Sequence, residues 1–383
     1  MSYRLYLLPV LAKSFTVDFF VLLPVLYAHK VITSAEIGYF GAVSIGMLVL
    51  GALVISRWLH RQSSKNILVL GASLAIISTV LLGGGLWLHA LWLILFSYAL
   101  SGMMVGFSMS ATNALVANHT NQHNRYAILA RSSMFGDLNR ITFPLVVVLA
   151  LRLGGLSGAI VVMLFVATAF AWSAATLPAE STAPEEPKLP PAKLRHNRVF
   201  QYFLGMEFLD SFASSQLFVF IPVLFLAKGY SLQSSLVLQT AIFLGYLSGR
   251  WVIGRLASKL SGSLAVAIAE AGMVATILLL LAAHSLPALY TLTWLLGVFA
   301  RGTSPVIKAL VFNSLHEAHI KQGSAMHVVA GDSGSALGQL AFGVLLAWIG
   351  VSAPFITAAI VAGLVAIFCV ARLRQAPVPS PAV

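Results

Sequence analysis

The stretch Pro24-Val25-Leu26-Tyr27 recurs as Pro222-Val223-Leu224-Phe225, 198 positions further along the chain. Three more pairs follow in the same order and at nearly the same spacing: Arg57 and Arg61 match Arg255 and Lys259, Asn113–Asn118 matches Lys308–Asn313, and Gly136-Asp137 matches Gly331-Asp332. One such pair could arise by chance. Four pairs in one order predict that the chain arose by duplication of a smaller unit.

The sequence around these pairs is strongly apolar. Of the 383 residues, 59% are hydrophobic and 9% are charged, whereas soluble domains carry roughly 25% charged residues. A membrane-spanning helix needs about 20 mainly apolar residues. We therefore predict an all-α membrane protein with twelve transmembrane helices, at residues 5–28, 35–57, 66–88, 91–117, 126–151, 155–177, 199–226, 233–256, 263–284, 286–314, 322–349 and 352–372.

The predicted spans fall into two groups of six. Between the groups, residues 178–198 are rich in Pro, Glu and Lys, a composition that cannot bury a core and behaves as a linker. The predicted organisation is one six-helix half at 1–177, a cytoplasmic linker at 178–198 and a second half at 199–383. Because each half has an even number of spans, the two bundles share one orientation and are related by an axis along the membrane normal.

The net charge of +12 would suggest a nucleic-acid partner in a soluble protein. Here most Lys and Arg residues lie in the termini, the linker and every second connection, as the positive-inside rule gives for cytoplasmic loops. We predict a multi-pass protein of the inner membrane with cytoplasmic termini, surrounded by lipid and without a nucleic-acid partner. The chain has no Walker motif and a single cysteine, so we predict no ATP-driven pump, disulfide, metal or cofactor.

The connection after the second span carries Arg57 and Arg61, preceded by Ser56, and the second copy runs from Gly249 to Arg255. In this pattern, and over essentially its whole length, the chain resembles the major facilitator superfamily, although both copies lack the acidic residue of that family's signature. The resemblance implies a cytoplasmic gate formed by Arg57, Arg61, Arg255 and Lys259. It also implies that the first, fourth, seventh and tenth spans line a central cavity, with the second, fifth, eighth and eleventh beside it and the others facing lipid.

The eleventh span contains a glycine-rich run, Gly331-Asp332-Ser333-Gly334-Ser335-Ala336-Leu337-Gly338-Gln339. This run resembles that of drug and siderophore exporters in the same superfamily. Gly334 and Gly338 would also let a neighbouring helix approach closely. The antiporter signature that this superfamily carries in its fifth span is not reproduced around Pro144. The glycine-rich run therefore favours export, whereas the fifth span gives no support for it.

Ionisable side chains inside a membrane are candidates for function because each costs at least about 2.5 to 3.5 kcal/mol to insert. The proton-coupling candidates are Asp18, Asp137, Glu207, Asp210 and Asp332. Glu207 and Asp210 are three residues apart and share one helix face. Two carboxylates in such surroundings cannot both ionise cheaply, so one is expected to hold a proton. A permanent salt bridge to a nearby base is the alternative interpretation for each acid.

The buried bases suggest a site for an anionic group. Arg140 and Arg301 fall near mid-membrane, where a guanidinium can bind a carboxylate or phosphate with two hydrogen bonds. Asp137 could instead neutralise Arg140 within one helix. Lys308 replaces Asn113 of the first repeat, as an asymmetric substrate site would require, and Phe107 is an aromatic candidate for the cavity wall. Glu270 falls on a predicted lipid-facing span, near an end where its side chain can reach the interface.

These features predict a monomeric secondary active transporter that moves a small organic solute by alternating access, coupled to protons. Efflux of a carboxylate, siderophore-like or drug-like compound is the leading prediction, and uptake of a sugar or an organic acid is the alternative. Lipid flipping is a further possibility in the same class. A membrane-embedded transferase would need a clustered His/Asp constellation at one interface, which the sequence does not display.

Overall fold

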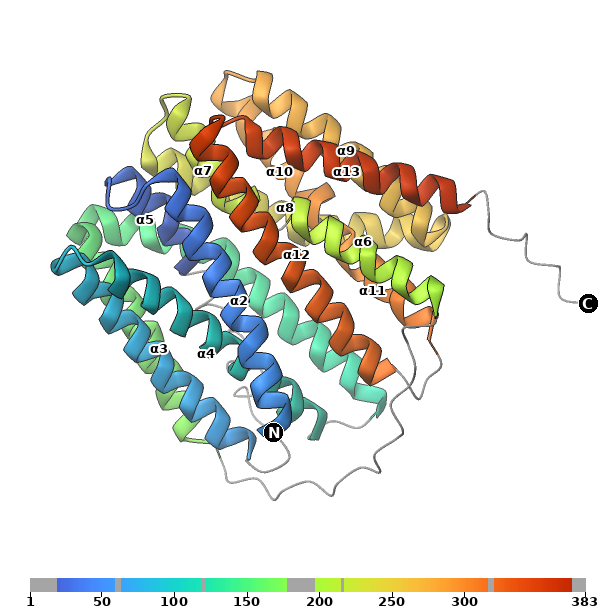
Figure 1. The fold of residues 1–383 in the computed structure, drawn as a ribbon. Helices are drawn as coiled ribbons and strands as arrows, with labels where there is room; N and C mark the ends of the chain where they lie inside the picture. The colour runs from blue at the N-terminus through green and yellow to red at the C-terminus, as the bar shows by residue number, and fades with distance from the viewer. Residues whose placement is uncertain are drawn as a thin grey trace, which may run out of the picture. The chain divides into compact units, whose positions relative to one another are not determined.

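The computed structural model describes residues 19–58, 63–118, 122–177, 197–214, 217–315 and 320–373, and no strand occurs among them (Figure 1). The first apolar helix is described over Phe19–Ala28. The remaining helices are α2 (Ser34–Trp58), α3 (Ser64–Trp87), α4 (Leu91–Asn118), α5 (Gln122–Ala175), α6 (Arg198–Ser214), α7 (Leu217–Ala227), α8 (Leu232–Lys259), α9 (Gly262–Ala282), α10 (Leu286–Gly302), α11 (Ser304–Asn313), α12 (Ile320–Trp348) and α13 (Ala353–Leu373).

The prediction of an all-helical membrane protein is confirmed for the described residues. Ten of their helical stretches are long and apolar enough to cross a membrane. Each predicted span coincides with a described helix or pair of helices, and the first is described only from residue 19 onwards. The total of twelve spans stays a prediction.

Two predicted spans, 126–151 and 155–177, lie within α5. The chain leaves the helical conformation at Gly154 and Gly155, and Gly155 has a φ of 58°, a backbone angle that side-chain-bearing residues rarely adopt. The predicted boundary between these two spans therefore coincides with the turn inside α5.

The predicted span 286–314 consists of two helices, α10 and α11, which meet at Thr303. Pro305 is the reason for the break, because proline has no N–H group to donate to the carbonyl oxygen four residues earlier. Interrupted helices of this kind occur at the binding sites of transporters.

The chain folds into two compact units. Unit 1 comprises the described parts of Met1–Leu189, Phe218–Thr240 and Gln339–Val351, and unit 2 those of Pro190–Leu217, Ala241–Gly338 and Ser352–Val383. Unit 1 thus contains segments from both sides of residues 178–198, whereas unit 2 begins at Pro190. The predicted organisation into six-helix halves at 1–177 and 199–383, joined by a linker at 178–198, stays a prediction.

In unit 1, α4 packs against both α2 and α3 (Figure 1). Glycines bring the backbones of α2 and α4 together. A Cβ atom added to Gly102 would collide with the carbonyl oxygen of Ser44, and one added to Gly106 would collide with that of Leu48. Small residues serve this purpose in membranes, where close van der Waals packing drives helix association.

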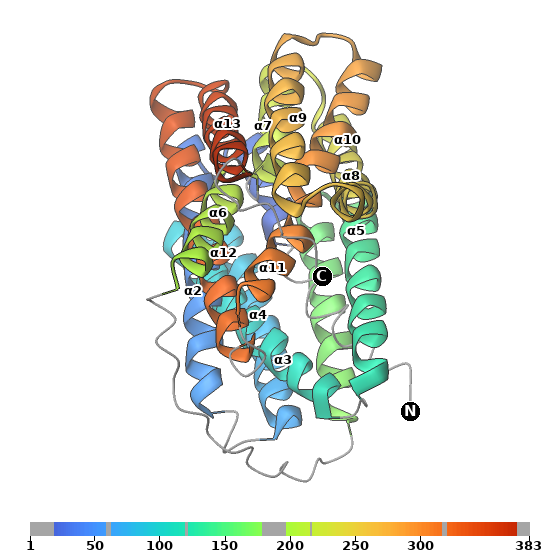
Figure 2. The same cartoon turned by 90° about the vertical axis from the view of Figure 1, so that its right-hand side faces the viewer.

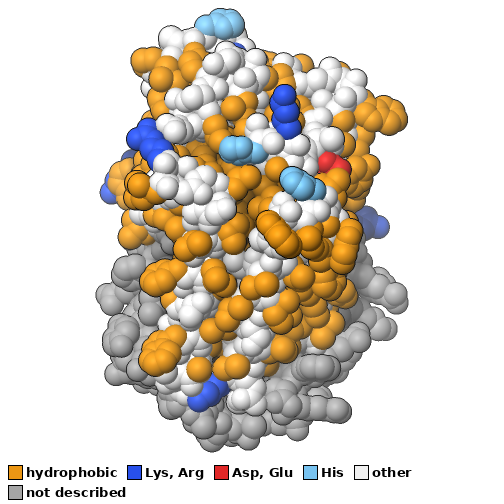
Figure 3. Space-filling view, turned by 90° about the vertical axis from the view of Figure 1, so that its left-hand side faces the viewer, with side chains coloured by type: hydrophobic (Ala, Val, Ile, Leu, Met, Phe, Trp, Pro, Cys, Tyr) orange, Lys and Arg blue, Asp and Glu red, His pale blue; other side chains and the backbone are white. Residues whose placement is uncertain are grey.

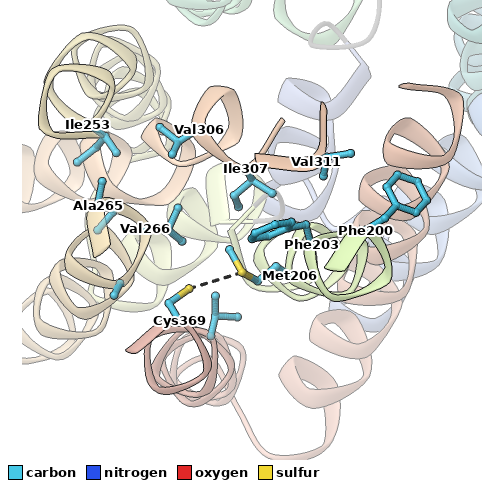
Figure 4. Packing of buried hydrophobic residues seen from close by; sticks show 13 residues of the cluster. Phe200, Phe203, Met206, Ile253, Ala265, Val266, Val306, Ile307, Val311 and Cys369 are labelled. Carbon is cyan, nitrogen blue, oxygen red and sulfur yellow. Dashed lines mark hydrogen bonds between the residues drawn. The ribbon is translucent and has the colours of Figure 1, made fainter. Parts of the chain in front are cut away.

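In unit 2, α9 packs against α10 and α13 (Figure 2), and α6 packs against α13 and α11. Apolar side chains from these helices form a buried core, drawn in Figure 4. The Sγ atom of Cys369 on α13 lies 3.6 Å from the Sδ atom of Met206 on α6. The cysteine is thus part of the packing, as its apolar sequence neighbours suggest.

The described surface is largely hydrophobic. Figure 3 shows a face on which apolar side chains predominate and charged ones are few. The most exposed large apolar residues include Trp87, Leu153, Phe165, Trp172 and Trp348. Such a surface fits a lipid environment, in which apolar side chains need no burial within the protein.

The glycine contact between α2 and α4 gives a stability prediction. We expect Gly102→Ala to lower the Tm of the purified protein, because overpacking costs about 1–3 kcal/mol. Gly46→Ala on α2 is the matched control, since a Cβ atom there meets nothing within 4 Å. The control should raise the Tm slightly, because alanine favours helix by about 1 kcal/mol over glycine. Equal responses of the two variants would contradict the packing described above.

Candidate functional site

Acidic side chains gather in unit 2. The structure describes the side chains of five acids, Glu36, Glu207, Asp210, Glu270 and Asp332. The last four interact with one another and are called the carboxyl cluster below. Glu207, Asp210 and Glu270 are 4%, 0% and 1% exposed, whereas Asp332 is half-buried. They come from α6, α9 and α12, so the cluster forms only when these helices pack.

Glu207 sits between α6 and α12. The Ser211 hydroxyl donates to its Oε1 atom over 3.3 Å, and the Nδ1 atom of His327 lies 3.7 Å from its Oε2 atom. Across from it, a Cβ atom added to Gly331 would lie 2.8 Å from Oε1. Glycine at position 331 therefore provides the space that the Glu207 carboxyl occupies.

The close approach of α12 to a neighbouring helix is confirmed. Cβ atoms added to Gly334 and Gly338 would collide with the carbonyl oxygens of Phe208 and Phe212 on α6. The glycine run thus brings the backbone of α12 against α6, next to Glu207. Its sequence pattern is explained by this packing, whatever the direction of transport.

Asp210 lies on α6 about one turn after Glu207. The Thr303 hydroxyl, at the break between α10 and α11, donates to its Oδ1 atom over 2.9 Å. The carboxyl of Glu270 lies within hydrogen-bonding reach of the Asp210 carboxyl. Among the described residues, the Oδ2 atom of Asp210 and both carboxyl oxygens of Glu270 have no other hydrogen-bond partner.

The predicted lipid-facing position of Glu270 is wrong. Its side chain is 1% exposed and points into the unit, where α9 packs against α10, α11 and α13. Buried residues recur along α9 at helical spacing, and Glu270 belongs to this stripe with Val266, Met273 and Ile277. The sequence indicates this stripe only weakly, because apolar residues occupy the other sides of α9 as well.

Arg301 is the cation of this site. It is half-buried at the end of α10 and interacts electrostatically with Glu207, Asp210 and Asp332. No direct ion pair of Arg301 occurs within the described part of the chain. The sequence shows no acid on the helix of Arg301, but the fold brings three carboxyls towards it from α6 and α12. A role in binding substrate stays a prediction.

The other substrate candidates lie as follows. Lys308 is exposed on α11, with its Nζ atom 5.6 Å from the ring centroid of Phe312. Phe107 is buried in α4 and Arg140 is half-buried in α5. Asn113 and Asp137 belong to α4 and α5, but their side chains lie outside the described parts, as does the whole of Asp18.

The predicted gate residues are only partly described. Arg255 is exposed on α8, and its guanidinium lies 4.4 Å from the ring centroid of Trp251. Lys259 is exposed at the end of the same helix. Arg57 lies in the last turn of α2, but its side chain is outside the described parts, and Arg61 lies outside the described residues. A gate that joins these four residues stays a prediction.

Comparison with known proteins gives a family match. The model of the Major Facilitator Superfamily matches residues 7–276 and 238–383. A comparison with curated proteins gave no match.

Several solved transporters have a similar fold. A bacterial homolog to the human lysosomal transporter Spinster, in an inward-facing and occupied conformation, aligns with a TM-score of 0.78 at 13% identity over 98% of each chain. A D-xylose–proton symporter aligns with a TM-score of 0.73 at 15% identity, covering 96% of this chain and 97% of its own. A nucleoside transporter aligns with a TM-score of 0.78 at 12% identity, covering 96% and 98%. At these identities the similarity establishes the fold alone.

The position of Arg301 predicts a pH-dependent stability loss. Arg301→Met removes the cation that faces Glu207, Asp210 and Asp332, so ionised carboxyls lose a favourable interaction. We expect a lower Tm at pH 8 and a smaller loss at pH 5, where more of these carboxyls are protonated. The decrease in the free energy of unfolding should stay below the roughly 3–5 kcal/mol that breaking a fully buried ion pair costs, because Arg301 is half-buried.

Arg255→Met is the matched control for this measurement. Arg255 is exposed and contacts Trp251 rather than an acid, so its replacement should give the same small change at both pH values. A loss for Arg301→Met that did not vary with pH would contradict the electrostatic role.

Proposed function

The chain belongs to the major facilitator superfamily, and on this premise we propose that it couples the movement of a small organic solute to the movement of protons. It is a multi-pass membrane transporter, since the family match covers most of the chain and the helices are long and apolar. Coupling, solute and direction are the parts that we propose.

The observation that carries the proposal is the charge balance of the carboxyl cluster. Among the described residues of unit 2, the cluster holds four carboxyls, and three of them, those of Glu207, Asp210 and Asp332, interact with the guanidinium of Arg301. If all four were ionised, three negative charges would be uncompensated among buried groups, which is costly. Protons are the ligands that neutralise such a group without needing space. The cluster therefore supports a role in which protons are taken up and released during transport.

Different members of the cluster have different access. Asp332 and Arg301 are half-buried, whereas Asp210 is fully buried. We propose that Asp332 exchanges protons with the aqueous path, and that the buried Glu207, which interacts with both Asp332 and Asp210, relays them to Asp210. The remaining coupling candidates, Asp18 and Asp137, keep their proposed role on sequence grounds.

The same charges relate the solute to the direction of transport. A carboxylate solute can pair with Arg301 only when the competing acids are protonated, so solute and protons would move together and a proton gradient would drive uptake. A cationic solute would bind the ionised cluster and be displaced by protons, which gives export. We propose export of a drug-like amine by antiport, because acids outnumber bases at the site. Uptake of an organic acid is the alternative that Arg301 supports.

We further propose that the protein works as a monomer in the inner membrane with both termini in the cytoplasm. The distribution of Lys and Arg along the sequence supports this orientation. Arg140, Asn113, Lys308 and Phe107 keep their proposed role as substrate contacts, and Arg57, Arg61, Arg255 and Lys259 keep theirs at a cytoplasmic gate.

Transport into everted membrane vesicles tests the proposal. Vesicles acidified inside should accumulate cationic drugs, and a proton uncoupler should abolish the accumulation. The same vesicles are screened with carboxylate siderophores, organic acids and sugars. Loss of an organic acid from preloaded acidic vesicles, rather than accumulation of an amine, would favour uptake in the cell. If no compound responded to the gradient, proton coupling would be wrong.

Gly331→Ala should impair coupled transport. The added methyl group would displace the Glu207 carboxyl from its place beside Ser211 and His327, and small misplacements in a site can lower rates by roughly 10²-fold. We expect at least a ten-fold loss of gradient-driven transport in vesicles with matched protein levels. Gly205→Ala on α6 is the control, because a Cβ atom there meets nothing within 4 Å. Equal transport by both variants would remove Glu207 from the coupling role.

A further inference from the structure

We infer that Asp210 and Glu270 hold one proton between them as a single unit, which makes Glu270 the positioning residue of the coupling acid Asp210. The assignment of Asp210 to coupling rests on the proposed function, whereas the shared proton follows from the geometry of the pair. Glu270 is not among the coupling acids predicted from the sequence, because it falls on a predicted lipid-facing helix.

The surroundings of the pair are apolar. Asp210 on α6 and Glu270 on α9 are 0% and 1% exposed. Met206, one turn before Asp210, and Ala269, next to Glu270, belong to the buried core of unit 2, as do Ile307 and Cys369. Figure 4 shows Met206 and Cys369 pointing toward each other in this core. Two negative charges would be costly in these apolar surroundings, because burying an ionised carboxylate without compensating partners is unfavourable.

The hydrogen-bonding capacity of the pair requires a proton. Ionised carboxylates only accept hydrogen bonds. Thr303 supplies one donor, to the Oδ1 atom of Asp210, and the other three carboxyl oxygens have no donor within the described parts of the chain. The two carboxyls nevertheless lie within hydrogen-bonding reach of each other. One of them must therefore donate, and only a protonated carboxyl can.

The neighbouring charges favour one proton rather than none or two. The titratable groups that act on the pair are Glu207 on α6, Arg301 on α10 and Cys369 on α13. Arg301 interacts with Asp210 as well as with Glu207 and Asp332, so one negative charge on the pair has a favourable partner. Removing the proton leaves a second, uncompensated negative charge. Adding a second proton removes the negative charge that interacts with Arg301 and accepts the hydrogen bond of Thr303. Two acids coupled in this way titrate as a unit.

A metal ion is the less favoured occupant. The described residues contain no group of three or more His, Cys, Asp or Glu side chains that could hold one. The pair offers two carboxyls and the Thr303 hydroxyl, and the proton accounts for the contact between the carboxyls without further ligands.

The pair is also tied to the break in the tenth predicted span. Thr303 separates α10 from α11, and its hydroxyl fixes the orientation of Asp210. Loss or gain of a proton changes the charge that this hydroxyl faces. Glu270 thus acts on Asp210 directly and on the α10–α11 junction through it.

Infrared spectroscopy on the purified full-length protein in lipid nanodiscs tests the shared proton. Protonated carboxyls absorb apart from carboxylates, and their band shifts in D2O. We expect Asp210→Asn and Glu270→Gln to remove the same band, and the double variant to remove no more than either alone. Glu36→Gln is the control, because Glu36 lies in unit 1 and accepts from the Thr33 N–H group.

Three results would overturn the inference. Two separate bands, one lost with each variant, would mean that each acid holds its own proton. Absence of any band sensitive to these positions would mean that both acids are ionised. A Tm that rises with NaCl but not with KCl, and only while Glu270 is present, would identify a sodium ion in place of the proton.

Transport then separates this inference from the proposed function. In Glu270→Gln the amide Nε2 group donates permanently to Asp210, so solute exchange between equal pools should persist while gradient-driven accumulation falls at least ten-fold. The Tm of this variant should stay close to that of the wild type, and Glu270→Leu, which supplies no donor, should lower it. If the wild type ignored the gradient, the function would be wrong while the shared band could still stand. A coupled wild type without the shared band would refute this inference alone.

Discussion

Buried charges within a membrane protein must be neutralised by the protein itself, because the bilayer supplies no water to solvate them. In the described part of unit 2, acids from α6, α9 and α12 lie together, and those of α6 and α12 interact with the guanidinium of Arg301 on α10. The charges do not balance when every acid is ionised. Under the proposed function, protonation of these carboxyls is part of the folded structure, and a change in protonation alters the interactions between α6, α9, α10 and α12.

Glycines determine which carboxyls can meet. Gly334 and Gly338 let α12 approach the backbone of α6, and Gly331 leaves the space in which the Glu207 carboxyl lies. A similar contact, through Gly102 and Gly106, joins α2 and α4 in unit 1. The packing of α12 against α6 and the position of the Glu207 carboxyl therefore depend on the same run of glycines, and a side chain at position 331 would disturb both.

The similarity to transporters of xylose and nucleosides places this chain in a fold that moves many solutes. At 12–15% identity, such a fold carries no information about the solute. The chemistry of the site is more informative. A site rich in acids and poor in bases attracts amines and protons, and Arg301 sets the condition under which a carboxylate could enter. The sign of the solute charge and the direction of proton-driven transport are therefore linked.

The sequence alone located the apolar helices that the structure describes, because a bilayer sets the length of each apolar stretch. It also placed Glu207 and Asp210 on one helix face and predicted the close approach at Gly334 and Gly338, since helical spacing is local. Only the tertiary structure placed Glu270 beside Asp210 and Thr303 against it, across 93 residues of sequence. In a membrane protein both the lipid-facing and the protein-facing sides of a helix are apolar, so the pattern of a single helix such as α9 only weakly indicates which side is buried. The choice is made by the helices that pack around it.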